Sequence, residues 1–204
     1  MKREEQDLLK LKSILNSINI PFFLMQGTLL GAIRDGTLIQ YDKDIDLGCS
    51  ADVEDPAIRM KIMHAFVKDG LNITLRGPGD NPRRPLYWIL ITGLKWQVAL
   101  LFFKEIDGQV LFTTCPIFFP AYLFHNLKEI DFLGEKFLVP NPPEEYLKVN
   151  YGKTWRIPAQ RRVIIKDSDP IEIYEPPQVE KVYLKCEKDG TLIVPLESIG
   201  PQLD

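Results

Sequence analysis

The segment GTLLGAIRDG, residues 27–36, and the acidic segment DKDID, residues 42–46, carry the clearest signal in this chain. The apolar run that precedes them, residues 22–25, is typical of a buried strand. We expect the first two residues of the glycine-rich segment to form a turn that enters a short helix over residues 29–34. Because the N-terminus of a helix offers N–H groups to an anion, this order of elements predicts a phosphate site.

Three carboxylates recur at every second position of the acidic segment, at Asp42, Asp44 and Asp46. On a strand they would project from one face, where like charges repel one another. A hard cation explains such crowding, because Mg²⁺ accepts one or two carboxylates together with substrate phosphates. The alternating Ile45 and Leu47 favour a strand whose other face lies in a core. The alternative is an acidic turn in solvent.

Together the two segments resemble the signature of the LicD/fukutin family, with Gln40 and Tyr41 where that family usually has Pro-Trp. The resemblance implies an α+β fold, with a nucleotidyltransferase-like mixed sheet flanked by helices. It also implies a metal-dependent phosphotransferase that moves a phosphocholine or phospho-sugar-alcohol group from a CDP-activated donor to a glycan or related acceptor. A second block fits the same family and extends the resemblance to about residues 5–160: FLG at 132–134, VP at 139–140, EYL at 145–147 and YGKTWRIP at 151–158.

The resemblance also gives the residues of the two segments their expected roles. Asp44 and Asp46 hold Mg²⁺ or Mn²⁺ against the donor phosphates. Asp42 is either a further metal ligand or the base that accepts the proton of the acceptor hydroxyl. Gly27 and Thr28 orient the phosphates through the main chain and the hydroxyl, so we expect the Thr28 side chain near a bound phosphate.

Arg34 is expected to neutralise charge on the leaving nucleotide, with a structural salt bridge to Asp35 or Asp42 as the alternative. The family pattern also places a third metal carboxylate on a later strand, and Ala99 falls at that place here. In this alignment Ala99 faces Asp44 and Asp46 across neighbouring strands. The chain then binds its metal less tightly, borrows a ligand or has lost catalysis. The rival interpretations are a catalytically impaired nucleotide-binding module of the same fold and a true nucleotidyltransferase.

Length and composition favour one main domain, because the chain has 204 residues of which 45% are hydrophobic. We expect residues 1–165 to form the LicD-like domain and residues 166–204 a short β-rich extension with a candidate hairpin around Asp189-Gly190. The net charge of −3 argues against a nucleic-acid partner. The expected partners are a CDP-linked small-molecule donor and a glycan or glycolipid acceptor.

Neither a signal peptide nor an integral membrane segment is visible in the sequence. The charged N-terminus is followed by no apolar run, and the most apolar segment, residues 117–124, is interrupted by Pro120. Three cysteines without a C-x-x-C spacing are poor evidence for a disulfide framework. We expect a cytoplasmic protein, or a trimmed soluble domain of an anchored one.

The remaining periodic segments predict further helices and strands. A helix that opens at Pro142 and ends near Gly152 is followed closely by Trp155, and we expect Tyr146, Tyr151 and Trp155 to pack against the sheet. Stacking of these rings on a cytosine is the alternative. Other helices are expected over residues 8–18 and 58–68, and strands over residues 71–75, 86–92, 95–103 and 109–113.

Overall fold

The computed structural model describes residues 1–52, 55–76, 88–112, 115–158 and three short strands at 182–183, 185–186 and 192–193. The helices are α1 (Arg3–Ser17), α2 (Gln26–Arg34), α3 (Pro56–Lys68), α4 (Tyr122–His125) and α5 (Pro143–Tyr151). The strands are β1 (Phe22–Leu24), β2 (Asp44–Cys49), β3 (Asn72–Arg76), β4 (Trp88–Thr92), β5 (Gln97–Ile106), β6 (Gln109–Phe112), β7 (Cys115–Pro120), β8 (Lys128–Phe132), β9 (Glu135–Val139), β10 (Val182–Tyr183), β11 (Lys185–Cys186) and β12 (Leu192–Ile193).

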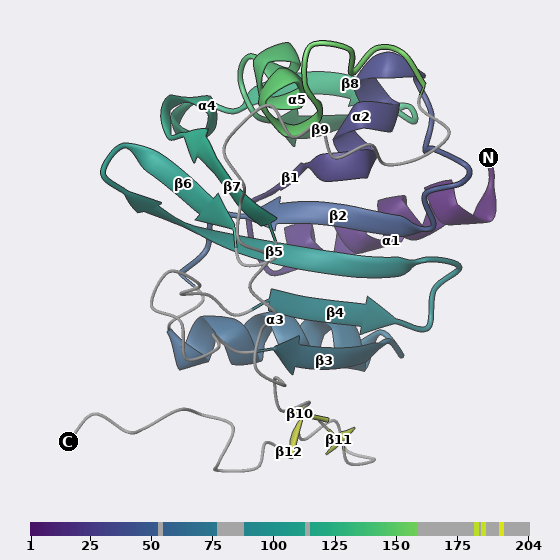
Figure 1. Cartoon of the computed structure of the whole chain (residues 1–204). Helices are drawn as coiled ribbons and strands as arrows, with labels where there is room; N and C mark the ends of the chain where they lie inside the picture. The colour runs from purple at the N-terminus through teal and green to yellow at the C-terminus, as the bar shows by residue number, and fades with distance from the viewer. Residues whose placement is uncertain are drawn as a thin grey trace.

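An eight-stranded mixed sheet forms the centre of the α+β fold, as the sequence predicted (Figure 1). Its main path runs β1-β2-β5-β4-β3-β10, and β6 and β7 continue the sheet from the far half of β5. Among the described strands, β2 and β5 pair in parallel, whereas the other pairs are antiparallel. The parallel pair matters most here, because it carries the acidic residues of β2.

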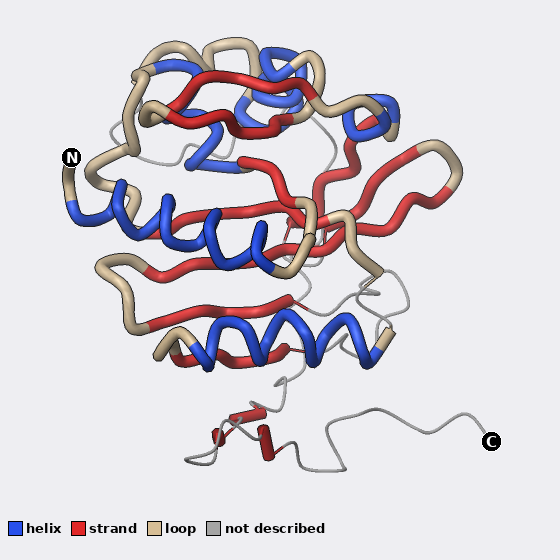
Figure 2. Tube along the Cα trace, turned by 180° about the vertical axis from the view of Figure 1, so that it is seen from behind, coloured by secondary structure: helices blue, strands red, loops and turns tan. Residues whose placement is uncertain are grey.

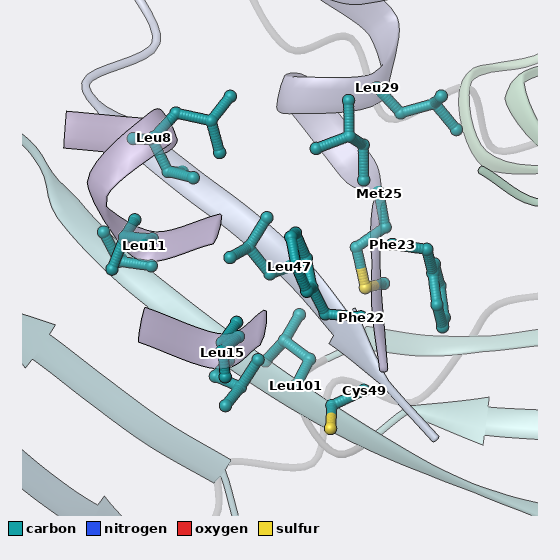
Figure 3. Packing of buried hydrophobic residues seen from close by; sticks show 14 of the residues in the cluster. Leu8, Leu11, Leu15, Phe22, Phe23, Met25, Leu29, Leu47, Cys49 and Leu101 are labelled. Carbon is teal, nitrogen blue, oxygen red and sulfur yellow. The ribbon is translucent and has the colours of Figure 1, made fainter. Parts of the chain in front are cut away.

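Helices α1 and α3 lie together against one face of the sheet (Figure 2). The apolar residues of α1 recur at helical spacing, which gives the helix a single face for the core. Leu8, Leu11 and Leu15 are fully buried and belong to the same cluster as Leu47 of β2 (Figure 3). This packing determines which face of β2 is turned to the core and which is left for the site.

The segments beyond residue 181 that the structure describes are short and paired. β10 pairs antiparallel with β3, with Val182 opposite Leu75, and β11 pairs antiparallel with β12. The two strands of the predicted hairpin therefore do pair, whereas its Asp189-Gly190 turn and the predicted domain boundary at residue 165 lie outside the described residues. Within the described part of the chain, no helix combines the length and the apolar character needed to cross a membrane.

Candidate active site

Asp44 and Asp46 project from the same face of β2, because strand side chains alternate between the two faces. Ile45 and Leu47 are fully buried on the opposite face. In the parallel ladder Asp46 lies opposite Ala99 of β5, so Ala99 shares the face of the two carboxylates. Neighbouring strands lie only about 4.8 Å apart, and a longer side chain at this position of β5 would stand beside Asp46.

One oxygen of the Asp44 carboxylate lacks a hydrogen-bond partner. Asp44 Oδ1 is buried and unpaired, which is costly for a charged group unless an ion or water satisfies it. In the described ranges, no group of three or more Asp, Glu, His or Cys side chains is arranged to hold a metal ion. This leaves Asp44 and Asp46 as a pair, which fits Mg²⁺ because that ion takes one or two carboxylates and completes its shell with phosphates and water.

Asp42 lies before β2 and not on its face, which corrects the prediction of three acids along one strand. The strand begins at Asp44, and the main-chain N–H of Asp42 donates to the Ile39 carbonyl, 3.1 Å away, in the preceding loop. The Asp42 carboxylate instead lies against Gly27, where an added Cβ would come within 1.9 Å of Asp42 Oδ2. Because Gly27 has no side chain, the Asp42 carboxylate can occupy this space.

Helix α2 begins at Gln26, so Gly27 and Thr28 lie in its first turn and not in a separate turn before it. The predicted boundary was wrong because the change of direction occurs earlier, between the extended Met25 and Gln26, whose φ is 48°. The first four N–H groups of an α-helix have no partner within the helix. The Asp42 carboxylate, which lies against Gly27, is therefore close to this end of α2.

Thr28 connects α2 to the main chain of β2. Its side chain is 2% exposed, and its hydroxyl accepts a hydrogen bond from the Asp46 N–H over 2.9 Å. The Asp46 carbonyl in turn accepts from the Met25 N–H over 3.3 Å. Thr28 therefore continues the hydrogen bonding of β2 beyond the end of β1, and it fixes the main chain at Asp46. A contact between this hydroxyl and a phosphate stays a prediction.

Replacing Thr28 by valine is expected to lower the free energy of unfolding by about 1–3 kcal/mol, because valine keeps the shape but removes the acceptor of the partly buried Asp46 N–H. Thr28→Ser retains the hydroxyl and is expected to cost less than about 1 kcal/mol, close to the worth of one buried methyl group. Urea unfolding of the two variants beside the wild-type chain measures the difference. A serine variant less stable than the valine variant would show that the methyl group matters and the hydroxyl does not.

Arg34 is engaged by its neighbour Asp35, which is one of the two structural alternatives predicted for it. Its Nε and Nη2 atoms donate to the two carboxylate oxygens of Asp35 over 2.8 and 2.7 Å. Hydrogen bonding to Asp35, and more weakly to the phenol of Tyr41, raises the pKa of the Arg34 guanidinium, and the same pairing lowers the pKa of the Asp35 carboxyl. Arg34 thus also contacts Tyr41, three residues before β2 begins at Asp44. A contact of Arg34 with substrate stays a prediction.

Comparison with known proteins places this chain in a family. Residues 19–142 match the family model described as LicD/FKTN/FKRP, nucleotidyltransferase domain. The chain belongs to this family. It is also 30% identical over 171 residues to the ribitol-5-phosphate transferases FKTN of Homo sapiens and Macaca fascicularis, and 30% identical over 175 residues to that of Mus musculus. These alignments cover 78% of this chain and 34% of each relative, so the chain spans about a third of their length.

The second block of this LicD-family chain lies mostly beyond residue 142, where the match to the family model ends. Its aromatic side chains nevertheless pack in the core. Tyr146 is fully buried and its ring stacks on Phe119, with centroids 4.7 Å apart and planes 7° from parallel. Trp155 is 5% exposed, and Tyr151 is partly buried against the same core. The prediction that these rings pack is confirmed, and the buried rings of Tyr146 and Trp155 leave no exposed face on which a base could stack.

Sequence reasoning missed two polar residues that join the two blocks of the LicD-family signature. The Gln26 N–H donates to the Tyr146 hydroxyl over 3.3 Å, and the Gln26 side-chain oxygen accepts from Asn150 Nδ2 over 2.6 Å. Neither Gln26 nor Asn150 has a residue type that marks a site. The available signal was their place in the sequence, because Gln26 directly precedes the segment 27–36 and Asn150 lies between EYL at 145–147 and YGKTWRIP at 151–158.

Proposed function

We propose that this chain is a metal-dependent phosphotransferase that moves a phospho-sugar-alcohol or phosphocholine group from a CDP-activated donor to a glycan or related acceptor. The observation that carries the proposal is the buried, unpaired Oδ1 of Asp44 in a two-carboxylate pair with Asp46. Membership of the LicD family supports it. The likeness to ribitol-5-phosphate transferases favours ribitol phosphate as the transferred group and CDP-ribitol as the donor.

Asp44 and Asp46 are the residues that would hold the Mg²⁺ or Mn²⁺ ion. Their oxygen ligands suit a hard cation, and the pair leaves coordination positions for phosphate oxygens. When bound, the ion neutralises charge on the donor phosphates and on the leaving group.

The first turn of α2 is proposed to bind the donor phosphates. Its N–H groups, at Gly27 and Thr28, carry the positive end of the helix dipole and suit an anion. The Thr28 hydroxyl acts indirectly in this arrangement, because it fixes the main chain of Asp46. Arg34, held by Asp35, is proposed to add positive charge for the departing nucleotide.

Asp42 is proposed to accept the proton of the attacking hydroxyl. The acceptor oxygen forms a bond to the distal phosphorus of the donor, the bond from that phosphorus to the bridging oxygen breaks, and CMP leaves with the electron pair. Asp42 lies against Gly27, so its carboxylate is at the first turn of α2, where the phosphates would bind. Proximity of base and phosphate is the main contribution that the protein makes to such a transfer.

A second candidate function is a nucleotide-binding module without turnover. The observation that favours it is Ala99, which occupies the position beside Asp46 where a carboxylate would complete a set of three. Such a module would bind a CDP-linked ligand yet release no CMP.

The experiment that tests the proposal is a CMP-release screen with CDP-ribitol, CDP-glycerol and CDP-choline, each with Mn²⁺ and with a chelator. We expect CMP from at least one donor with Mn²⁺ and none with the chelator. Nucleotide binding without CMP from any donor, in a folded sample, would favour the binding module. Pyrophosphate formed from CTP and a polyol phosphate would favour a true nucleotidyltransferase.

A further inference from the structure

Gln26 has an unusual backbone conformation at the point where α2 begins. Its φ is 48°, in the left-handed region that side chains other than glycine seldom occupy. A residue held there is strained, and such strain persists only where the surrounding structure enforces it.

Two residues of α5 supply that enforcement. The Tyr146 hydroxyl accepts from the Gln26 main-chain N–H over 3.3 Å, and Asn150 Nδ2 donates to the Gln26 side-chain oxygen over 2.6 Å. Tyr146 is itself immobilised, because its ring is fully buried and stacked on Phe119. The two helices lie side by side in the fold (Figure 1).

The two residues that follow Gln26 contact the acidic residues, so the backbone conformation of Gln26 affects where they lie. Gly27 comes next and has the Asp42 carboxylate against its Cα, at a distance that leaves no room for a Cβ. Thr28 follows and accepts the hydrogen bond of the Asp46 N–H. A rotation of the Gln26 backbone would therefore move two contacts to the acidic residues at once.

We propose that Tyr146 and Asn150 are positioning residues, which hold Gln26 in the left-handed conformation and so set the first turn of α2 against Asp42 and Asp46. Their effect on turnover rests on the proposed function, whereas their effect on the backbone of α2 does not. The proposal gives the second signature block a role at the site through Tyr146, which acts on the main chain of Gln26.

The test compares Tyr146→Phe and Asn150→Ala with the wild-type chain. Each variant is expected to raise amide hydrogen exchange by about tenfold at Leu29, whose N–H donates to the Met25 carbonyl across Gln26, and at Asp46, whose N–H donates to the Thr28 hydroxyl. CMP release is expected to fall by about tenfold, which corresponds to the loss of about one hydrogen bond. Exchange at Met63 in α3 serves as the reference for any change in global stability. Tyr122→Phe is the matched control, because it also removes a phenol bond to α5, at Glu145, but does not touch Gln26.

A rescue variant separates positioning from general stabilisation. Glycine adopts a positive φ without steric cost, so Gln26→Gly should make the contact with Asn150 unnecessary. The double variant Gln26→Gly/Asn150→Ala is expected to release CMP at a rate within about twofold of Gln26→Gly alone. Once residue 26 is glycine, Asn150 has no side chain to bond there, so its replacement should have no further effect.

The proposal is overturned if exchange at Leu29 and Asp46 rises no more than at Met63, or if the double variant is as impaired as Asn150→Ala. If the wild-type chain releases no CMP from any donor, the proposed function fails while the exchange measurements still decide whether Tyr146 and Asn150 hold the start of α2.

Discussion

Asp44→Asn is expected to reduce metal-dependent CMP release by at least about 100-fold, the size of loss seen when a group that stabilises transition-state charge is removed. The same variant should be as stable as the wild-type chain without metal, or slightly more stable. The reason is that Asp44 Oδ1 is buried without a partner, so the amide removes a charge that only a cation would pair. Asp46→Asn should behave in the same way, because it also relieves repulsion on the face of β2.

CMP release and a thermal melt, measured on the same samples, check both expectations. Asp131→Asn provides the control, because Asp131 is an exposed strand carboxylate paired with Lys136 at the surface of the β8–β9 hairpin. If either β2 variant unfolds, or keeps full activity, the two acids are structural and the metal site is not at β2.

Ala99→Asp is expected to tighten Mn²⁺ binding by roughly tenfold or more, equivalent to about 1.4 kcal/mol, and to increase or create CMP release. The ladder places position 99 beside Asp46, on the carboxylate face. Without metal the new charge is repelled by Asp46 and lies next to the half-buried Leu90 of β4, so the metal-free variant should melt at a lower temperature than the wild-type chain. Mn²⁺ should reverse that loss, because a ligand stabilises the state that binds it.

Melting curves with and without Mn²⁺ measure the effect, and Ala99→Asn is the matched variant with the same size and no charge. A metal-independent loss of several kcal/mol in Ala99→Asp, typical of an unpaired buried charge, would show that position 99 takes no part in metal binding.

The sequence predicts the elements whose residues alternate or recur regularly. A strand with Ile45 and Leu47 facing the core was predicted, and β2 has this arrangement because its alternating apolar residues meet a core on one face only. The β8–β9 hairpin was not predicted. Its turn has Leu133 and Gly134 at φ values of 55° and 79°, and leucine is not a residue that signals such a turn. Packing of Phe137 against Phe22 of β1, with ring centroids 6.3 Å apart, is a long-range contact that local patterns do not encode.

In the candidate site too, some features could be predicted from the sequence and others could not. The face shared by Asp44 and Asp46 follows from the period of a strand, so it could be predicted. The place of Ala99 on that face was predicted through the family resemblance alone, and the pairing of β2 with β5 confirms it. The departure of Asp42 from that face could not be predicted, because the start of β2 depends on space that Gly27 leaves in another element. The hydrogen bond from Asp46 to the Thr28 hydroxyl was missed for a related reason, since it depends on how α2 is placed against β2.

The metal-dependent phosphate site at Asp44 and Asp46 is tested most directly by calorimetric titration of CDP-ribitol into the wild-type chain, with Mn²⁺ and with a chelator. The same titration into Asp46→Asn is the comparison. We predict binding to the wild-type chain with Mn²⁺, none with the chelator and none to the variant. Equal affinity with the chelator, or undiminished Mn²⁺-dependent affinity in Asp46→Asn, would contradict the assignment of these carboxylates as the metal site.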